Sequence, residues 1–201
     1  MKTLEQFKSH TVSTAPAYGT RSWHASLVFK NRMWVMAGRG NGIHNDVWAS
    51  EDGNSWEMIT AEGPFCIRRH PAATVFKNKM WIAGGRNGVL SDDHSLNDVW
   101  FSENGEDWTA ATLNANFTHR FGHTLTAFKG HLWLIGGFKI SKTWATDKVV
   151  ASTDGSLWFP INKTLAFGNR AYHTSLAHDN KLWVIGGVGA SVLGPDTTGN
   201  A

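Results

Sequence analysis

Four arginines return along the chain at nearly even intervals, as Arg21, Arg68, Arg120 and Arg170. A guanidinium group can bind a carboxylate through two parallel hydrogen bonds, so four of them around one axis could hold an acidic ligand. The same recurrence has a structural interpretation. Each arginine could bond a backbone carbonyl or a neighbouring aspartate and so lock adjacent repeats. A residue that returns in every repeat favours this structural role, and the sequence leaves both roles open.

Two of the eleven tryptophans, Trp23 and Trp144, fall outside the positions that recur. An exposed indole is a good platform for a peptide or a sugar, although a loop tryptophan can also fold back onto its own sheet. Arg39 and Arg86 follow glycine-rich strand ends and would add positive charge. The predicted ligand-binding residues are Arg21, Arg68, Arg120, Arg170, Trp23, Trp144, Arg39 and Arg86. Weaker candidates are His44, Asp92, Asp93 and His94.

Histidines also recur, as His24, His123 and His173, but Pro71 takes the corresponding place in the second copy. The chain has no His-Glu-x-x-His and no paired cysteines, so it predicts no metal site and no cofactor. A hydrogen bond to the neighbouring repeat is the expected role of these imidazoles. Cys66 is the single cysteine, and we expect a small buried or half-buried side chain and not a catalytic thiol.

The arginines belong to a long internal repeat. Seventeen residues after each arginine stands a glycine, and a Ser-to-Trp spacing of six residues follows three times. Each of these tryptophans precedes the next arginine by twelve residues, whereas the Gly-to-Ser distance varies between 12, 17 and 15. Variable segments on a fixed scaffold are where binding specificity is usually placed. The glycines are Gly38, Gly85, Gly137 and Gly187.

Each unit predicts four short strands, in the first copy residues 26–30, 33–38, 46–50 and 56–60. A Lys-Asn, Lys-Gly or Asp-Asn pair makes a tight turn after the first strand. "ASEDGNSW" (49–56), which returns as "FSENGEDW" (101–108) and "ASTDGSLW" (151–158), makes the second hairpin. Its glycine allows positive φ, its serine can bond the turn, and its tryptophan buries a large ring. One carboxylate or amide per turn is too few ligands for a calcium site.

The bulk composition agrees with one globular β-rich domain. The chain has 201 residues, 41% hydrophobic and 17% charged, with 21 glycines. The net charge of +3 is spread without a basic run, so no nucleic-acid partner is expected. We find no apolar leader and no stretch of about 18 apolar residues, so we expect no membrane partner. Without a leader or a cysteine pair, a cytoplasmic location is favoured.

The unit resembles the kelch repeat of the galactose oxidase-like propeller superfamily. The Gly-Gly at the second strand's end, the aromatic residue in the third strand and the tryptophan that opens the fourth fall in kelch order. The third copy departs, with Val150 where Trp48 and Trp100 stand. The resemblance, over about 21 to 190, implies an all-β fold, a kelch-type β-propeller with about four blades' worth of four-stranded antiparallel sheets. Such sheets bury both faces only by stacking around an axis.

One domain is expected over 1–201, with repeats at about 21–67, 68–119, 120–169 and an incomplete 170–201. Residues 1–20 would be the outer strand of a preceding or closing blade. Because four blades are few, a partial or truncated ring is the favoured interpretation. A closed four-blade ring and completion by self-association through open blade edges remain alternatives.

The resemblance implies a binding module that recognises a peptide or glycan, with an acidic one favoured, through the loops of one propeller face. An enzyme is the less favoured class. The alternative is a carbohydrate isomerase like the sialic-acid mutarotase of this superfamily, with Asp92, Asp93 or Glu62 as the carboxylate beside the arginines. A structural fragment of a larger propeller is a further alternative. A copper oxidase is disfavoured because the tyrosines, Tyr18 and Tyr172, do not match its site.

Overall fold

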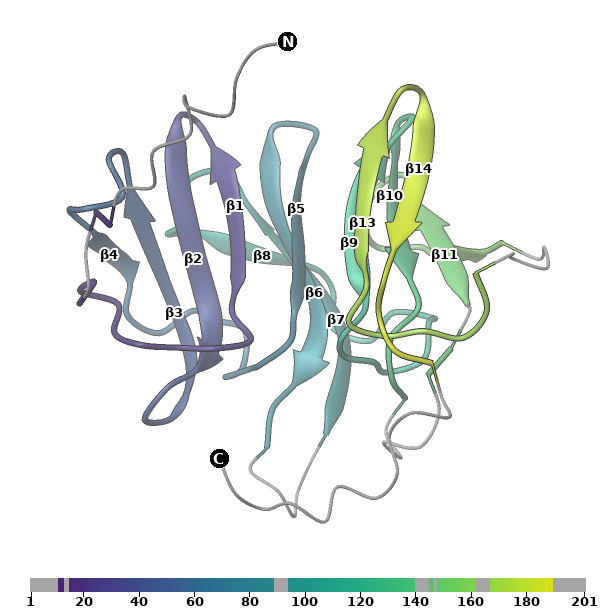
Figure 1. The fold of residues 1–201 in the computed structure, drawn as a ribbon, viewed down its shortest axis with the longest axis horizontal. Coiled ribbons are helices and arrows are strands. Elements are labelled where there is room, and N and C mark those ends of the chain that lie inside the picture. The colour runs from purple at the N-terminus through teal and green to yellow at the C-terminus, as the bar shows by residue number, and fades with distance from the viewer. Residues whose placement is uncertain are drawn as a thin grey trace, which may run out of the picture.

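The chain folds into antiparallel sheets arranged side by side (Figure 1). The computed structural model describes residues 11–12, 15–88, 94–139, 145–146, 148–161 and 167–189, and these residues contain strands and no helix. None of the described residues forms a helix that is long and apolar enough to cross a membrane. The strands are β1 (Ala25–Phe29), β2 (Arg32–Arg39), β3 (Ile43–Ser50), β4 (Glu57–Thr60), β5 (Ala72–Phe76), β6 (Lys79–Arg86), β7 (Ser95–Ser102), β8 (Trp108–Thr112), β9 (Thr124–Phe128), β10 (His131–Ile135), β11 (Val149–Ser152), β12 (Phe159–Pro160), β13 (Thr174–His178) and β14 (Lys181–Ile185).

Three sheets have four strands each in simple sequential order, β1 to β4, β5 to β8 and β9 to β12. The fourth sheet pairs β13 with β14. We call these sheets blades 1 to 4. The innermost strands β1, β5, β9 and β13 are neighbours in that order. The predicted all-β architecture with about four blades is confirmed. The turns between the first two strands of each blade lie at the top of Figure 1, and the connection from β2 to β3 lies at the bottom.

Both predicted hairpins form as their residue types require. Lys30 and Asn31 have φ of 47° and 59°, the left-handed pair of a two-residue turn, and the corresponding pairs in the other blades do the same. In the second hairpin the Ser50 hydroxyl accepts the N–H of Gly53 at 2.8 Å, and the Trp56 indole donates to the Gly53 carbonyl at 2.9 Å. These bonds recur around Gly105 and Gly155. The triplicated motif is therefore structural.

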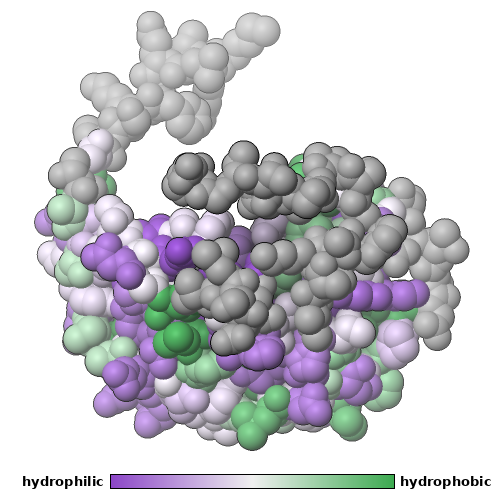
Figure 2. All heavy atoms as spheres, turned by 90° about the horizontal axis from the view of Figure 1, so that it is seen from below, coloured by the Kyte–Doolittle hydropathy of each residue, from purple (hydrophilic) through white to green (hydrophobic). Residues whose placement is uncertain are grey.

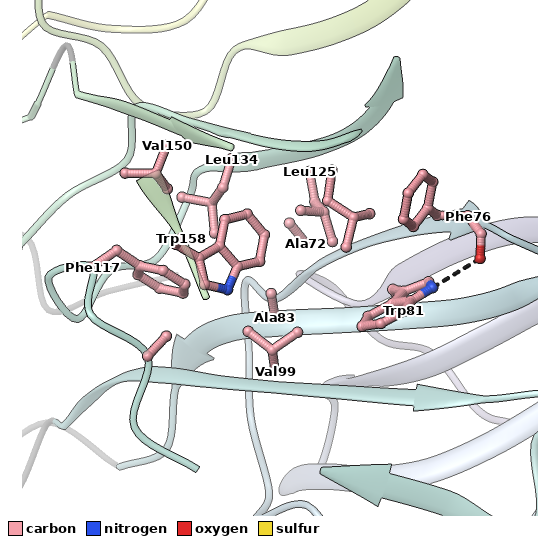
Figure 3. Close-up of a cluster of buried hydrophobic side chains, with 12 residues drawn as sticks. Ala72, Phe76, Trp81, Ala83, Val99, Phe117, Leu125, Leu134, Val150 and Trp158 are labelled. Carbon is pink, nitrogen blue, oxygen red and sulfur yellow. Dashed lines mark hydrogen bonds between the residues drawn. The ribbon is translucent and has the colours of Figure 1, made fainter. Parts of the chain in front are cut away.

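The hydrophobic core lies between the blades (Figure 3). Between blades 2 and 3, the Trp158 ring is 1% exposed and packs edge-on against Phe117, with ring centroids 5.3 Å apart. Between blades 1 and 2, Trp108 packs against Phe65 in the same way at 5.2 Å. Blades 2 and 3 therefore each bury the hairpin tryptophan against a phenylalanine from the blade before. Edge-to-face pairs of this kind are favourable for aromatic rings.

A glycine at the end of one blade's second strand lies against a histidine at the start of the next blade, and we call these two repeated positions the glycine and histidine columns. They bring the backbones of adjacent blades close together. His123 of blade 3 lies against the Ala83 carbonyl of blade 2, with Nε2 and the oxygen 3.2 Å apart. A Cβ atom at Gly84 would come within 2.7 Å of the His123 ring, and one at Gly136 within 2.8 Å of the His173 ring. In the first copy Ala37 replaces this glycine, and the histidine position of the next blade is Pro71. A glycine therefore stands where the next blade has a histidine. In the one pair of adjacent blades without this glycine, the histidine is also replaced.

We expect Gly84→Ala to lower the free energy of unfolding by about 3 kcal/mol, because the new Cβ meets His123 and the backbone φ is +58°. Gly130 is the matched control, since its φ is +74° but nothing lies within 4 Å of a Cβ there. Gly130→Ala should lose only about 1 kcal/mol. Adding His123→Ala to Gly84→Ala should cost less than the two single changes combined. Urea unfolding measures the cycle, and strict additivity would contradict the steric pairing.

Burial and the charge of Arg120 lower the pKa of His123 to about 3, and burial and Arg170 lower that of His173 to about 4. The unfolded chain therefore binds more protons than the folded one below pH 6.5. Stability should be complete above that pH and fall toward pH 4, by about 1 kcal/mol per imidazole for each pH unit. His123→Asn should reduce this slope in urea unfolding between pH 7.5 and 4.5. An unchanged slope would show that His123 titrates normally.

Candidate functional site

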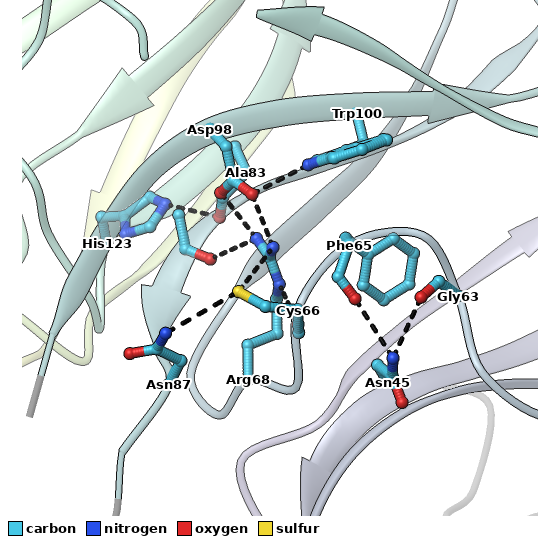
Figure 4. Close-up of polar contacts among 11 residues, drawn as sticks. Asn45, Gly63, Phe65, Cys66, Arg68, Ala83, Asn87, Asp98, Trp100 and His123 are labelled. Atoms are coloured by element: carbon cyan, nitrogen blue, oxygen red, sulfur yellow. Dashed lines mark hydrogen bonds and ion pairs between the residues drawn. The ribbon is translucent and has the colours of Figure 1, made fainter. Parts of the chain in front are cut away.

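We call the four recurring arginines, Arg21, Arg68, Arg120 and Arg170, the anchor arginines. Their side chains extend into the blades, where their guanidinium groups form hydrogen bonds. Arg68 is fully buried and donates to both carboxylate oxygens of Asp98 at 2.8 and 2.6 Å (Figure 4). It also donates to the carbonyls of Gly84 and Cys66 at 3.0 and 3.1 Å. The Trp100 indole shares the same carboxylate at 2.8 Å. Bidentate pairing and full hydrogen bonding compensate the cost of burying this charge.

Blade 1 repeats the arrangement around Arg21, whose side chain is 2% exposed. Arg21 contacts both Asp46 oxygens at 2.7 and 3.0 Å and the Ala37 carbonyl at 3.0 Å, and it donates to the Tyr18 carbonyl. Burial alone would raise the pKa of Asp46, but hydrogen bonds from Arg21 and Trp48 outweigh it and lower that pKa. The ion pair is thus held within one blade.

Blade 3 departs from this pattern in two coupled positions. Lys148 stands where the first two blades have an aspartate, and Val150 stands where they have its indole partner. Arg120, 1% exposed, bonds instead to the carbonyls of Gly136 and Lys148 and to the Thr118 hydroxyl, at 3.0, 3.3 and 2.9 Å. Burial lowers its pKa to about 10, which still leaves it charged at neutral pH.

Arg170 likewise donates to backbone carbonyls, those of Gly186 and Phe167. The guanidinium groups thus act inside their own blades, and the links to the preceding blade are made by the backbone. The N–H of Gly38 donates to the Arg68 carbonyl at 2.9 Å, and the same bond joins the next two pairs of blades. This geometry supports the structural role of the four arginines, and a direct ligand role for them stays a prediction.

The residue two positions after each anchor arginine lies at the centre of the blades. It is Trp23, His70, Gly122 and Tyr172 in turn, and all four have φ between 53° and 63°. Trp23 stacks on His70 with ring centroids 4.6 Å apart, and Tyr172 lies 5.1 Å from the same imidazole. Trp23 is 45% exposed and Tyr172 is 46% exposed. Two open rings therefore contact one imidazole.

Three arginines gather beside these rings. The backbones of Arg69 and Arg86 pair with each other, and the Arg86 guanidinium lies 4.4 Å from the Phe121 ring centroid. Arg69 lies 5.8 Å from the centroid of Trp23. In blade 1, Arg39 occupies the position that Arg86 has in blade 2, and Arg39 is half-buried. We call Trp23, His70, Tyr172, Phe121, Arg39, Arg69 and Arg86 the axial cluster.

The arginines of the axial cluster keep their charge at neutral pH. Burial and the charge of Arg69 lower the pKa of Arg86 to about 10, and burial with the charge of Arg39 lowers that of Arg69. Burial, Arg69 and Arg86 lower the pKa of His70 to about 3, so this imidazole is neutral. An anion placed among these groups would relieve the repulsion between like charges.

A cavity of about 240 Å³ opens at the axial cluster. Each blade contributes two consecutive residues to its lining, namely Trp23, His24, His70, Pro71, Gly122, His123, Tyr172 and His173. Nδ1 of His123 and Nδ1 of His173 are buried, and among the described residues neither has a hydrogen-bond partner. Figure 2 looks onto the face that carries the connection from β2 to β3, where the coloured hydrophilic side chains surround smaller hydrophobic patches. The cavity thus offers aromatic surface, neutral imidazoles and nearby positive charge.

The remaining sequence predictions are scattered. Trp144, Asp92 and Asp93 lie outside the described residues, and Glu62 and His94 are exposed. Cys66 is exposed, so the expectation of a buried or half-buried thiol is wrong; the residue lies in the connection before Arg68, with its Sγ 3.6 Å from an Arg68 nitrogen. Among the described residues, no three His, Cys, Asp or Glu side chains are grouped to hold a metal ion.

Sequence reasoning missed Arg69, His70, Phe121 and Tyr172 as members of one site. The signal was present, because the position two after each anchor arginine carries a ring in three of four copies. The sequence prediction centred on the invariant arginine and left out the variable residues beside it. In a repeat protein, the variable positions beside an invariant one are where a site can differ between copies.

Comparison with known proteins agrees with this architecture. The solved structure described as "Structure of YjhT" superposes with a TM-score of 0.67 at 16% sequence identity, over 83% of this chain and 59% of that one. The chain therefore spans about three fifths of that protein's length, and at this identity the likeness concerns the fold alone. No curated protein sequence matches the chain. The KLHDC2/KLHL20/DRC7 Kelch-repeats domain family matches residues 1–187. With nearly its whole length matched and its blades in kelch order, the chain belongs to the Kelch-repeat propeller family.

Proposed function

We propose that this protein is a binding module that recognises an acidic peptide or glycan at the axial cluster. The observation that carries the proposal is the convergence of Arg39, Arg69 and Arg86 beside the exposed rings of Trp23 and Tyr172. Exposed aromatic rings contribute contact area at low entropic cost, and guanidinium groups attract carboxylates. The ligand's apolar or sugar surface would lie on the rings while its acid group faces the arginines.

The roles of the arginines differ with their burial. Arg39 is half-buried, so its guanidinium is the one positioned to contact a ligand directly. Arg69 and Arg86, at 3% and 8% exposure, supply positive potential from below the surface. In this proposal Arg21, Arg68, Arg120 and Arg170 fix the loops that present the site. Attraction by partly buried charge weakens with salt less than attraction by surface charge does.

The neutral imidazoles add hydrogen-bonding capacity. His123 lies against a carbonyl oxygen through Nε2, and because a carbonyl only accepts, Nε2 carries the proton and Nδ1 is an acceptor. Because Nδ1 is buried, a ligand hydroxyl or amide N–H would have to displace a lining side chain of the cavity to donate to it. Hydroxyl groups are abundant in glycans and amide groups in peptides, so this feature supports both ligand classes.

The first experiment is a probe array that carries acidic peptides, anionic glycans and neutral counterparts of both. Labelled protein should bind acidic probes of one class. Trp23→Ala and Arg39→Gln should each weaken that binding at least about tenfold, because each removes a side chain that the proposal places against the ligand. Melting temperatures should stay within a few degrees, since neither residue is buried.

Phe159→Ala is the matched control, because Phe159 is 63% exposed but lies on β12, away from the axial cluster. It should bind like the parent chain. The proposal fails if Trp23→Ala and Arg39→Gln bind acidic probes as well as the control does. It also fails if neutral and acidic probes bind equally.

A further inference from the structure

The two terminal blades expose faces that the inner blades bury. Ile185 on β14 is 54% exposed, whereas the residues at its position in blades 1, 2 and 3 are at most 1% exposed. Trp183 is 43% exposed, whereas its counterparts Trp34 and Trp81 are buried and Trp133 of blade 3 is half-buried. On the opposite side of blade 1, Val28 is 68% exposed and Met58 is 51% exposed, whereas Val75 and Ala110 at the same positions of blade 2 are half-buried. Each terminal blade thus presents an apolar face of the kind that blades use to stack.

The contacts between inner blades define what such faces require. In every adjacent pair, a glycine N–H at the second strand's end donates to the anchor-arginine carbonyl of the next blade at 2.9 Å. A tryptophan of the second strand also lies on a hairpin glycine of the next blade. A Cβ atom at Gly105 would be 2.2 Å from Trp34, and one at Gly155 would be 2.1 Å from Trp81. Only glycine fits beneath these rings.

Blade 4 offers one half of each of these contacts, and blade 1 offers the complementary half. Blade 4 carries Trp183, and blade 1 carries Gly53, where the atoms nearest to a built Cβ belong to Met33 and Val12 of the described residues. Among the described residues, the Gly187 N–H and the Arg21 carbonyl have no interblade bond. These are the groups that join neighbouring blades elsewhere in the chain.

The glycine and histidine columns give an independent test of this match. A glycine faces a histidine of the next blade at two places, Gly84 with His123 and Gly136 with His173. At the third place, Ala37 stands at the glycine position and Pro71 at the histidine position. Blade 4 ends in Gly186, with nothing within 4 Å of a built Cβ, and blade 1 begins with His24. The outward face of blade 4 is thus of the type that a histidine-bearing blade fits, and blade 1 bears the histidine.

Blade 1 already has the outer part of a preceding blade in place. Tyr18 packs edge-on against Trp56 with centroids 4.7 Å apart, as Phe65 and Phe117 of one blade pack against the tryptophan of the next. What blade 1 lacks beside it is the inner pair of strands. Strands β13 and β14 are such a pair, and they pair with each other in a sheet of their own.

We propose that the outward face of blade 4 docks on the free face of blade 1 of a second copy of this chain. A two-fold axis makes both such contacts at once, so that each copy uses both faces and the assembly closes at two chains. About eight blades then surround the axis, within the range that propellers form. One interblade contact would be missing, because Asp179 replaces the lysine that donates to the next blade in blades 1 and 2.

Light scattering on a sizing column tests this arrangement. The parent chain should have twice its 22.2 kDa mass. Ile185→Lys and Val28→Glu each place a charge on one of the two faces and should give monomers, with circular dichroism unchanged because both side chains are exposed. Leu157→Glu is the control, since Leu157 is 61% exposed on the hairpin of blade 3 and should leave the dimer intact.

Mixing the two monomeric variants decides how the copies are joined. The mixed dimer retains one unaltered contact, and in its other contact the introduced lysine faces the introduced glutamate, so the mixture should recover the dimer. No recovery, or a dimer lost only with Ile185→Lys, would overturn the blade 4 to blade 1 contact. A parent monomer whose melting temperature falls with either substitution would place that contact within one chain and also overturn the proposal. The proposed ligand binding is measured separately and does not depend on this result.

Discussion

The fold depends on the approach of one blade's backbone to the next, where a glycine N–H meets an arginine carbonyl. At Gly38, Gly85 and Gly137 the φ values are +99°, +103° and +96°, and a Cβ atom would lie within 2.9 Å of atoms at the first strand's entrance in the glycine's own blade. Only glycine satisfies both conditions. The contact fixes the arginine's backbone, and the arginine in turn positions the residues that follow it at the axis. The repeat is therefore invariant at the glycine and arginine and free to vary just beyond them.

Burying a guanidinium in each of blades 1 to 3 imposes a second constraint, because a buried charge must be compensated. Blades 1 and 2 do this with an aspartate that the indole of the same strand also bonds. Blade 3 has Lys148 and Val150 instead, and its arginine relies on carbonyls and a hydroxyl. The departure of Val150 from the repeat is explained by this coupling, since an indole without its carboxylate acceptor would leave a buried donor unpaired.

Local chemistry made the fold predictable. Hairpins, strand order and blade architecture follow from glycines, turn pairs and alternating apolar residues within a few positions of one another. The site was harder to predict, because the proximity of Arg69, Arg86 and Tyr172 depends on register between blades about fifty residues apart. Trp183 illustrates the same limit: its repeat position predicts a core residue, but its burial depends on a neighbouring blade that the described chain does not place there.

The backbone conformation at the axis is relevant to the role of the rings in the axial cluster. Trp23, His70 and Tyr172 occupy the left-handed region, where a side chain costs about 1 kcal/mol or more relative to glycine. Blade 3 has Gly122 at this position with φ of 63°, so glycine is compatible with the fold there. The rings do pack between blades, since Trp23 stacks on His70 and Tyr172 lies over Gly122, but this packing leaves Trp23 and Tyr172 45% and 46% exposed. Strain of this kind is typical of sites where the side chain itself is required, and here two of the three rings face solvent beside clustered positive charge.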